Sequence, residues 1–548
     1  VYGTLTINAN WTVNAWNHIT QYGGSIVDYK GNAGLRYQST SGNGENRYTT
    51  SGTSESSWAL ITKSDYVSGE PTSVMSTATV TAAADGLWDV SYLVINNMAS
   101  VLFGSGSGTN LMSHFRMVNC VFDSAGFFKT SQFSRLANDF IFENIDIRHS
   151  HPADISSAYF MELLAERNIA GTPTGIKRFK NVTARFDDER SAKYLRAISL
   201  DYFTDIGFYS DCVIFKLSSP RTAVTITNSS ARTTIPENTG QFQFGDPSQS
   251  GNVYDNNVYL VDGTDYVYTG TIHGFENQAL PTFTNNYVEE IFLQTGLDGS
   301  DWYAAPLTGT VTITRNIFVM QNGGVIVNSF KGDTSANITM DHNTYISKYS
   351  NGGSSNPYGS LMRTETGKRF VGGTNSLNNN LAWVLDTSGS SDGNIAAVHF
   401  GSTVALNDQL DNIITNNYHN MGVTLSLLYR GVTSSTKTLG DATYGGSDTF
   451  LDPQMTNYPM TSESPLIAFA ESKGKTTTKQ LWGELIKING FNETTRRQET
   501  ASKINYGTAE VLQFVRNSVR PTNALLATAA NDGTTIGAVE YEAPASSG

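Results

Sequence analysis

Charged residues gather between positions 146 and 196, although Asp, Glu, Lys and Arg make up only 16% of the 548-residue chain. Arginine can hold an acidic group through paired hydrogen bonds, and histidine or a carboxylate can move a proton. We take as candidate catalytic residues Arg148, Arg185, His149, His151, Asp187 and Asp188. The alternative is a solvated face crossed by salt bridges, because structural ion pairs also concentrate charge.

The spacing of the arginines suggests that they share one side of a stacked structure. Similar segments end in arginine at 143–148, 180–185 and 227–232, and each has asparagine as its second residue. If these segments are stacked strands, Arg148 and Arg185 lie on adjacent strands and Arg232 lies two strands further on. Like charges this close repel each other unless carboxylates or an anionic ligand neutralise them. We therefore expect Arg232 to bind the same acidic ligand.

The alignment rests on a repeat that is most regular between residues 256 and 347. Its markers Asn257, Asn286, Asn316 and Asn343 are 29, 30 and 27 residues apart, and each precedes a β-branched or aromatic run. Such a repeat predicts one layer of parallel strands per copy. Asparagine tolerates a left-handed turn, and its amide can bond to the asparagine of the next layer. Weaker copies have their markers at Asn119, Asn144, Asn181, Asp211, Asn228, Asn380 and Asn417.

A recurrent turn asparagine before a β-rich run resembles the right-handed parallel β-helix family, the pectate-lyase-like superfamily of secreted bacterial or phage proteins. The resemblance implies an all-β solenoid with an asparagine ladder and short helical C-terminal elements. No enzyme family within it is matched. The Asp-Asp at 187–188 resembles the polygalacturonase pair, but the accompanying Asn-Thr-Asp, Gly-His-Gly and Arg-Ile-Lys segments are missing from the chain.

Three regions are predicted. Residues 1–110 form a β-rich N-terminal cap with the first layers, residues 111–465 form the parallel β-helix, and residues 466–548 form a C-terminal cap. Within the C-terminal cap, apolar spacing predicts helices at 478–488 and 509–519, and a closing strand is expected at 531–541.

The N-terminal region looks less regular than the repeats. Short strands are predicted at Thr4–Asn8 and Gly24–Tyr29, and a polar loop at Ser41–Ser57. The first regular layer is expected at Val90–Phe103.

Strand alternation sorts each repeat into two faces. Counting from the marker, we expect the first and third residues to point inward and the second and fourth outward. The second position holds aromatic residues, which can stack on sugar rings and are therefore candidate carbohydrate-binding residues: Tyr259, Phe318 and Tyr345. The alternative is that a loop or the C-terminal helices cover them, because large exposed apolar patches are rare.

The two cysteines, Cys120 and Cys212, each follow a marker and should point inward as buried free thiols. Three layers would separate them, about 14 Å at strand spacing, which is too far for a disulfide.

Bulk properties narrow the partners. The formal net charge of −13 argues against nucleic acid, and the chain has no apolar run long enough for a transmembrane helix. No cofactor is firmly predicted. Calcium is a candidate because its preferred oxygen ligands occur in predicted loops, at Asp262, Asp265, Asp298 and Asp301. The eight histidines show no zinc spacing.

Three functions remain open. The first is an extracellular or cell-surface protein that engages polysaccharide, as a binder or as a lyase or glycoside hydrolase. The second is a non-catalytic structural or adhesive protein, such as a filament, surface-layer or adhesin component, with self-association. The third is a phage tailspike-like depolymerase, which would need a long apolar stripe between subunits.

Overall fold

In the computed structural model the protein consists mostly of strands in parallel sheets, with few helices among the described residues, in agreement with the all-β prediction. The described residues are 1–8, 11–13, 18–31, 35–37, 47–65, 77–80, 86–97, 100–103, 111–123, 128–130, 135–136, 139–149, 159–164, 177–186, 194–198, 205–211, 214–218, 225–233, 241–243, 253–261, 270–275, 282–289, 291–295, 310–320, 328–330, 337–349, 362–364, 375–386, 398–400, 414–415, 418–419, 429–431, 436–437, 449–450, 453–455, 457–458, 464–477, 491–492, 497–498 and 508–543.

The chain forms two compact units. Unit 1 comprises residues 1–236 and 482–507, and unit 2 comprises residues 237–481 and 508–548.

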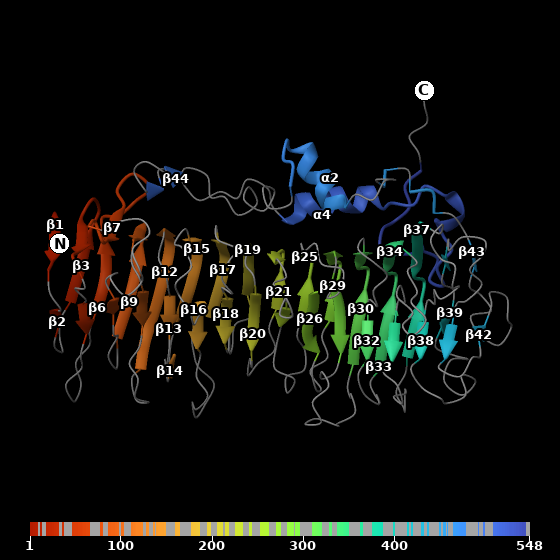
Figure 1. The fold of residues 1–548 in the computed structure, drawn as a ribbon, viewed down its shortest axis with the longest axis horizontal. Helices are drawn as coiled ribbons and strands as arrows, with labels where there is room; N and C mark the ends of the chain where they lie inside the picture. The colour runs from red at the N-terminus through yellow and green to blue at the C-terminus, as the bar shows by residue number, and fades with distance from the viewer. Residues whose placement is uncertain are drawn as a thin grey trace. The chain divides into compact units, whose positions relative to one another are not determined.

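Unit 1 is built from rows of parallel strands (Figure 1). One row contains β1 (Thr4–Ile7), β4 (Ile26–Tyr29), β7 (Ala59–Thr62), β10 (Leu93–Asn96), β12 (Leu111–Asp123), β15 (Phe140–His149), β17 (Lys177–Phe186), β19 (Asp205–Asp211) and β22 (Ser230–Thr233). A second row joins β3 (His18–Tyr22), β6 (Arg47–Ser51) and β9 (Gly86–Ser91) to the first halves of β12, β15, β17 and β19, and then to β21 (Thr225–Thr227).

A third row of unit 1 contains β8 (Thr77–Val80), β11 (Ser100–Phe103), β13 (Phe128–Thr130), β16 (Tyr159–Leu164), β18 (Tyr194–Ile198) and β20 (Ile214–Ser218). Short additional strands are β2 (Trp11–Val13), β5 (Leu35–Tyr37), β14 (Arg135–Leu136), β44 (Phe491–Asn492) and β45 (Arg497–Gln498).

The regular parallel pairing starts earlier than expected. The short strands predicted near residues 4–8 and 24–29 are present as β1 and β4, and they already pair in parallel with each other. The prediction that regular layers begin at Val90 is therefore wrong. The predicted loop Ser41–Ser57 is also wrong in part, because residues 47–51 form strand β6.

Unit 2 repeats the same plan with three strands per repeat. The first row contains β24 (Val253–Asp255), β27 (Thr282–Thr284), β30 (Thr310–Thr314), β33 (Asn337–Asp341), β36 (Asn375–Asn378) and β39 (Ile414–Thr415). The second contains β25 (Val258–Val261), β28 (Tyr287–Glu289), β31 (Ile317–Met320), β34 (Thr344–Tyr349), β37 (Leu381–Asp386), β40 (Tyr418–His419) and β43 (Thr449–Phe450).

The third row of unit 2 contains β23 (Gln241–Gln243), β26 (Gly270–Phe275), β29 (Ile291–Thr295), β32 (Asn328–Phe330), β35 (Met362–Thr364), β38 (Val398–Phe400) and β41 (Tyr429–Gly431). The antiparallel strand β42 (Thr436–Lys437) ends this row.

A two-residue turn links the first and second rows of unit 2. Its first residue has a left-handed backbone, with φ between 54° and 58°, at Asn256, Asn285, Arg315, His342 and Asn379. Its second residue is a buried asparagine, at Asn257, Asn286, Asn316, Asn343 and Asn380. The sequence analysis expected one asparagine to adopt the left-handed backbone and to form the ladder bond. In the structure two neighbouring residues divide these two roles.

The buried asparagines form the expected ladder. In each step the side-chain oxygen of one asparagine accepts from the backbone N–H of the asparagine before it, and in the three steps from Asn286 to Asn380 it also accepts from that residue's side chain. At Asn316 these distances to Asn286 are 2.9 and 3.1 Å. Asn316 Nδ2 in turn donates to Phe283 O at 2.9 Å and to Asn343 Oδ1 at 3.1 Å. The ladder thus satisfies backbone groups that would otherwise be buried without partners.

The upstream markers occupy the other turn position. Asn119, Asn144 and Asn228 themselves have φ between 51° and 56°, so they match Asn256 and not the ladder residue Asn257. Asn144 Nδ2 still donates to Asn119 Oδ1 at 3.0 Å. In unit 1 the asparagine marker is the left-handed residue of the turn, whereas in unit 2 the marker is the residue after it. Equal distances from a marker therefore lead to opposite faces in the two units.

The C-terminal segment covers the second row of unit 2 (Figure 1). Helix α4 (Thr508–Ser518) confirms the helix expected at 509–519, and the one expected at 478–488 lies outside the described residues. Helix α2 (Pro465–Ser472), which was not predicted, begins at Ser464, whose Oγ accepts from Ile467 N. The 3-10 helix η1 spans Ala524–Leu526. Residues 531–541 form turns and bends, so the predicted closing strand is wrong.

The left-handed turn residues are the contact points for this C-terminal cover, residues 508–543. Arg516 donates to Asn256 Oδ1 at 3.1 Å and to Asn285 O at 3.0 Å. Arg315 pairs with Glu540 at 2.9 Å, and Asn379 Oδ1 accepts from the backbone N–H of Asn531 at 3.0 Å. Polar contacts to the turns therefore align the cover, and apolar residues beneath it are shielded.

We predict that Asn316→Ala lowers the free energy of unfolding by about 2–4 kcal/mol, because it leaves the buried Asn286 N–H and Phe283 C=O without partners. Chemical denaturation followed by circular dichroism measures the change. Asn457→Ala is the control, since Asn457 is exposed. Equal stability of the two variants would contradict the structural role of the ladder.

We predict that Gly537→Ala displaces the C-terminal cover. Gly537 has φ +89°, and an added Cβ would lie 2.8 Å from Thr344 Oγ1 and 3.1 Å from Leu381 Cβ. Gly533→Ala is the matched control, because its φ is +81° but nothing lies within 4 Å. Both variants lose about 1–2 kcal/mol to the left-handed backbone. Only Gly537→Ala should also open residues 508–543 to limited proteolysis, and equal protection in both variants would contradict the docking.

Candidate functional site

The predicted arginines share one register position in the first row of unit 1. Arg148 on β15 pairs with Arg185 on β17, as expected from their spacing. Arg185 pairs with Asp211 on β19, which pairs with Arg232 on β22. On the other side Arg148 pairs with Asp123 on β12. We call this series the charged column, and its order is Asp123, Arg148, Arg185, Asp211 and Arg232.

A second series runs beside the charged column, two residues earlier on each strand. It consists of Val121, Asp146, Thr183, Tyr209 and Ser230, and we call it the neighbouring column. Residues two apart on a strand belong to the same face of a sheet. The two columns therefore belong to one sheet face over β15, β17, β19 and β22.

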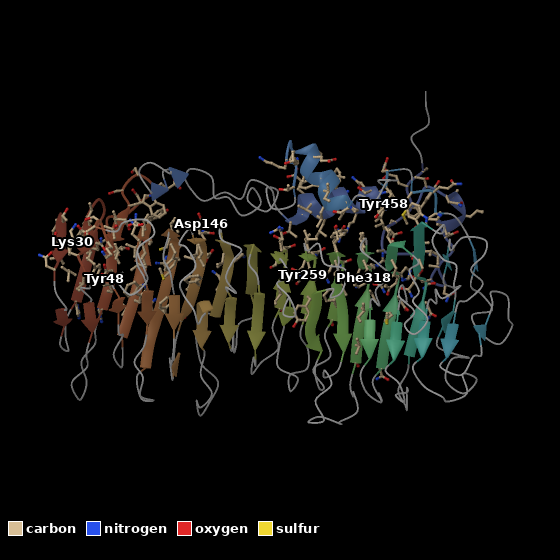
Figure 2. All side chains as sticks on the ribbon, viewed as in Figure 1. Lys30, Tyr48, Asp146, Tyr259, Phe318 and Tyr458 are labelled. Atoms are coloured by element: carbon tan, nitrogen blue, oxygen red, sulfur yellow. The ribbon has the colours of Figure 1, made fainter. Side chains whose placement is uncertain are left out.

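The described side chains of this face are enclosed. Asp146, labelled in Figure 2, is 1% exposed and Arg232 is 5% exposed. The Ser230 hydroxyl is buried and has no hydrogen-bond partner in the described part of the chain. The same holds for Oδ1 of Asn96, which pairs in register with Asp123. Buried polar atoms of this kind are normally satisfied, so both positions suit a water molecule or a ligand hydroxyl.

The other predicted catalytic residues do not join the charged column. His149 is the last residue of β15 and pairs with Phe186. Because consecutive strand residues belong to opposite faces, His149 is not in the series that contains Arg148. His151, Asp187 and Asp188 lie outside the described residues.

The aromatic stripe predicted to bind sugars is buried. Tyr259 and Phe318 are fully buried and Tyr345 is 4% exposed. The Tyr259 ring, labelled in Figure 2, stacks on Phe283, with centroids 6.3 Å apart. Burial raises the pKa of the Tyr259 hydroxyl well above its ordinary value. The prediction that these residues point outward is therefore wrong. The markers in unit 2 are the second residues of their turns, so the alternation counted from them is shifted by one residue.

The outward position in unit 2 belongs instead to the residue directly after the ladder asparagine. Thr344 Oγ1 accepts from Ala538 N of the C-terminal cover at 2.9 Å. Its column contains Val258, Tyr287, Ile317, Thr344 and Leu381, all of which are buried. The cover therefore occupies the face that the aromatic prediction had assigned to a glycan.

Two residues were given the wrong role by the sequence pattern. Asp211 was taken as a ladder marker, but it lies between Arg185 and Arg232 in the charged column. Ser230 was not singled out, although it lies two residues before Arg232 and therefore belongs to the same face in the alternation counted from Asn228.

Other arginines on the same strands already have carboxylate partners. Arg116 Nη1 lies 2.8 Å from Asp89 Oδ1, and Arg178 Nη1 lies 3.2 Å from Glu143 Oε2. All four side chains are between 29% and 39% exposed, so these pairs contribute little to stability. These two ion pairs lie in the second row of unit 1, away from the charged column, so their arginines serve as controls for substitutions in that column.

Cys120 is a free buried thiol, as predicted, and burial raises its pKa to about 12. Cys212 itself lies outside the described residues. The preceding residue, Asp211, is on β19, three strand steps from β12, in agreement with the predicted separation.

The described residues bear on the predictions about metal binding and membrane-spanning helices as follows. The four aspartates proposed for calcium, Asp262, Asp265, Asp298 and Asp301, lie outside the described residues. Among the described residues no group of three or more His, Cys, Asp or Glu side chains could hold a metal ion. In the same part of the chain, no helix has the length and apolar character needed to span a membrane.

A second cluster of titratable groups surrounds His342 in unit 2. His342 Nε2 lies 3.1 Å from Thr534 Oγ1 and 3.6 Å from Asp532 Oδ2 of the C-terminal cover. The charged groups facing it are Asp532, Arg315, Asp341 and Glu540. Burial lowers the pKa of His342, and Asp532 opposes this effect. The cluster joins the cover to a turn, so we assign it a structural role.

Comparisons with family models, curated proteins and solved structures find no match for this chain.

We predict that the cover is less stable at mildly acidic pH. Because the pKa of folded His342 lies below the unfolded value of about 6.5, the unfolded chain binds more protons as the pH falls below that value. The stability of unit 2 should therefore be greatest above pH 6.5 and should decline towards pH 5.5. Proteolytic protection of residues 508–543 across this range measures the effect.

His342→Asn is the matched variant, since asparagine occupies the same left-handed turn position at Asn256, Asn285 and Asn379. It should weaken the pH dependence between pH 5.5 and 7.5, where ordinary carboxylates do not titrate. An unchanged pH profile would show that His342 does not link pH to docking of the cover.

Proposed function

We propose that this chain is a right-handed parallel β-helix protein of the extracellular space or cell surface, and that it engages polysaccharide at the charged column. The parallel rows and the asparagine ladder support the β-helix, because each repeat adds one strand to each row and contacts mainly its neighbours. The low content of charged residues and abundant turn residues fit an exported all-β protein.

The observation that carries the binding proposal is the register pairing of Arg148 with Arg185. Two arginines about 4.8 Å apart on neighbouring strands repel each other unless carboxylates, such as those of Asp123 and Asp211 in the same column, or a bound anion neutralise them. Guanidinium groups bind carboxylates and other planar anions through paired hydrogen bonds. An acidic sugar supplies such an anion.

Cleavage of the bound chain, by a lyase or a glycoside hydrolase mechanism, is an extension of this proposal. Asp146 and Tyr209 of the neighbouring column have the chemistry to transfer protons. The same assay can therefore score binding and depolymerisation.

A structural or adhesive role is the second candidate, and the C-terminal cover favours it. The cover seals the apolar column of unit 2 and joins successive turns, which stiffens the repeat array. The aromatic stripe that hinted at a trimeric tailspike-like depolymerase is buried within unit 2, so that alternative loses its support.

We predict that Arg148→Ala/Arg185→Ala weakens binding to an acidic glycan at least tenfold in a glycan-array and titration assay. The matched control is Arg116→Ala/Arg178→Ala, which also removes two arginines from unit 1 but takes them from existing ion pairs. The control should bind as wild type. Arg148→Lys/Arg185→Lys keeps the charge and should retain part of the affinity.

Thermal unfolding of all variants separates loss of binding from loss of fold. If both double-alanine variants bind acidic glycans as well as wild type, the site is elsewhere. If wild type neither binds nor cleaves any acidic or neutral glycan, the polysaccharide proposal fails and the structural role becomes the better account.

A further inference from the structure

Two tyrosines at the first strands of unit 1 form a stacked and exposed ring pair. Tyr2 precedes β1, and Tyr22 is the last residue of β3. Their ring centroids lie 4.0 Å apart, with an angle of 15° between the ring planes. Aromatic pairs in proteins usually have centroids about 4.5–7 Å apart, so this contact is close. Tyr2 is 78% exposed, and molecules in solution can therefore reach the pair.

Backbone hydrogen bonds on both sides of Tyr2 hold its ring in place. Tyr22 N donates to Val1 O at 3.0 Å, and Ile26 N donates to Gly3 O at 2.9 Å. The residues before and after Tyr2 are therefore bound to the following repeat. The stack is thus a fixed feature of the β-structure and not a contact made by a freely rotating side chain.

The hydroxyl groups of the two rings lie at the same edge of the stack. A side-chain hydrogen bond with Tyr22 is the main reason why the pKa of the Tyr2 hydroxyl lies above its ordinary value. Hydroxyl oxygens joined by a hydrogen bond are about 2.7–2.8 Å apart. Because the rings are also nearly parallel, the Cε carbon beside the hydroxyl of one ring lies close to the corresponding carbon of the other. Two phenols couple through these carbons.

We infer that Tyr2 and Tyr22 are a site of oxidative cross-linking, at which a haem peroxidase with hydrogen peroxide joins the two rings as dityrosine. Each phenol gives one electron and one proton to the oxidant and becomes a phenoxyl radical. The two radicals form one carbon–carbon bond between their Cε atoms, and the hydrogens on these carbons move to the phenol oxygens. Two tyrosines and one hydrogen peroxide thus give one dityrosine and two waters. This modification is independent of polysaccharide binding.

Burial separates this pair from other tyrosines that contact aromatic rings. Tyr48 stacks on Trp88 with centroids 4.5 Å apart, but both residues are buried. Tyr254 and Tyr259 in unit 2 are buried as well. A peroxidase oxidises phenols that reach solvent, so these tyrosines are protected. Tyr29 at the end of β4 is also buried, and its place in the same part of the chain makes it a suitable reference.

The cross-link fastens the segment before β1 to the end of β3. A covalent bond between residues 2 and 22 restricts the unfolded chain between them, as a disulfide does. Local opening of β1 and β3 then separates fewer groups from the following repeat. We therefore expect slower amide hydrogen exchange in these two strands once the bond has formed.

The test treats the full chain at low concentration with a haem peroxidase and hydrogen peroxide, isolates the monomer and digests it with trypsin. Lys30 is the first lysine or arginine, so residues 1–30 form one peptide, with tyrosines at Tyr2, Tyr22 and Tyr29. The wild-type peptide should show dityrosine fluorescence and a mass lower by two hydrogen atoms. Tyr2→Phe and Tyr22→Phe should lose both signals, whereas the matched control Tyr29→Phe should keep them.

Each outcome decides the inference. A wild-type peptide that stays unmodified, or that only gains oxygen, overturns it. Retention of the signals in Tyr2→Phe, or their loss in Tyr29→Phe, also overturns it, because a different pair of tyrosines then reacts. Circular dichroism before oxidation shows that each variant keeps the fold. Equal hydrogen exchange of β1 and β3 in treated and untreated wild type would contradict the fastening of this segment.

Discussion

The turn between the first and second rows fixes the position of the strand residues on both sides of it. A left-handed residue reverses the chain, and in unit 2 the next residue is an asparagine whose amide bonds to the following layer. The ladder leaves no freedom for a layer to slip by one residue, because a slip would strand buried backbone groups. This register determines which residues face the core. It also determines which residues meet the C-terminal cover and which share the charged column.

The repeat made the parallel rows predictable from sequence, since its spacing and its β-rich runs exclude helical layers. The pairing of Arg148 with Arg185 followed from the same spacing. The faces in unit 2 were not predictable from the marker alone. Asn256 and Asn257 look alike in sequence, yet one is the left-handed residue and the other the buried ladder residue. Because alternation has a period of two, one uncounted turn residue moved Tyr259, Phe318 and Tyr345 from the core to the surface in the prediction.

The docking of the C-terminal cover onto distant strands and turns could not be predicted from the sequence either. Gly537, Ala538 and Glu540 meet residues more than 150 positions away in the chain, Leu381, Thr344 and Arg315, and nothing local identifies those partners. Asp211 shows a related limit. It follows a short strand and precedes a cysteine, as a marker would, and only the pairing with Arg185 and Arg232 reveals its place among the charges. The residues of the proposed site therefore share a column across strands, which the linear sequence conceals.

The register of the charged column is the central claim, and disulfide trapping tests it at one-residue resolution. In a chain with Cys120 and Cys212 replaced by alanine, Arg148→Cys/Arg185→Cys places two thiols on neighbouring strands at about 4.8 Å, within the range of a disulfide. Mild oxidation followed by thiol counting should show that this pair closes. The shifted pair Arg148→Cys/Ala184→Cys should stay reduced, because its two residues belong to opposite faces. Closure of the shifted pair, with the aligned pair still reduced, would contradict the register and the site built on it.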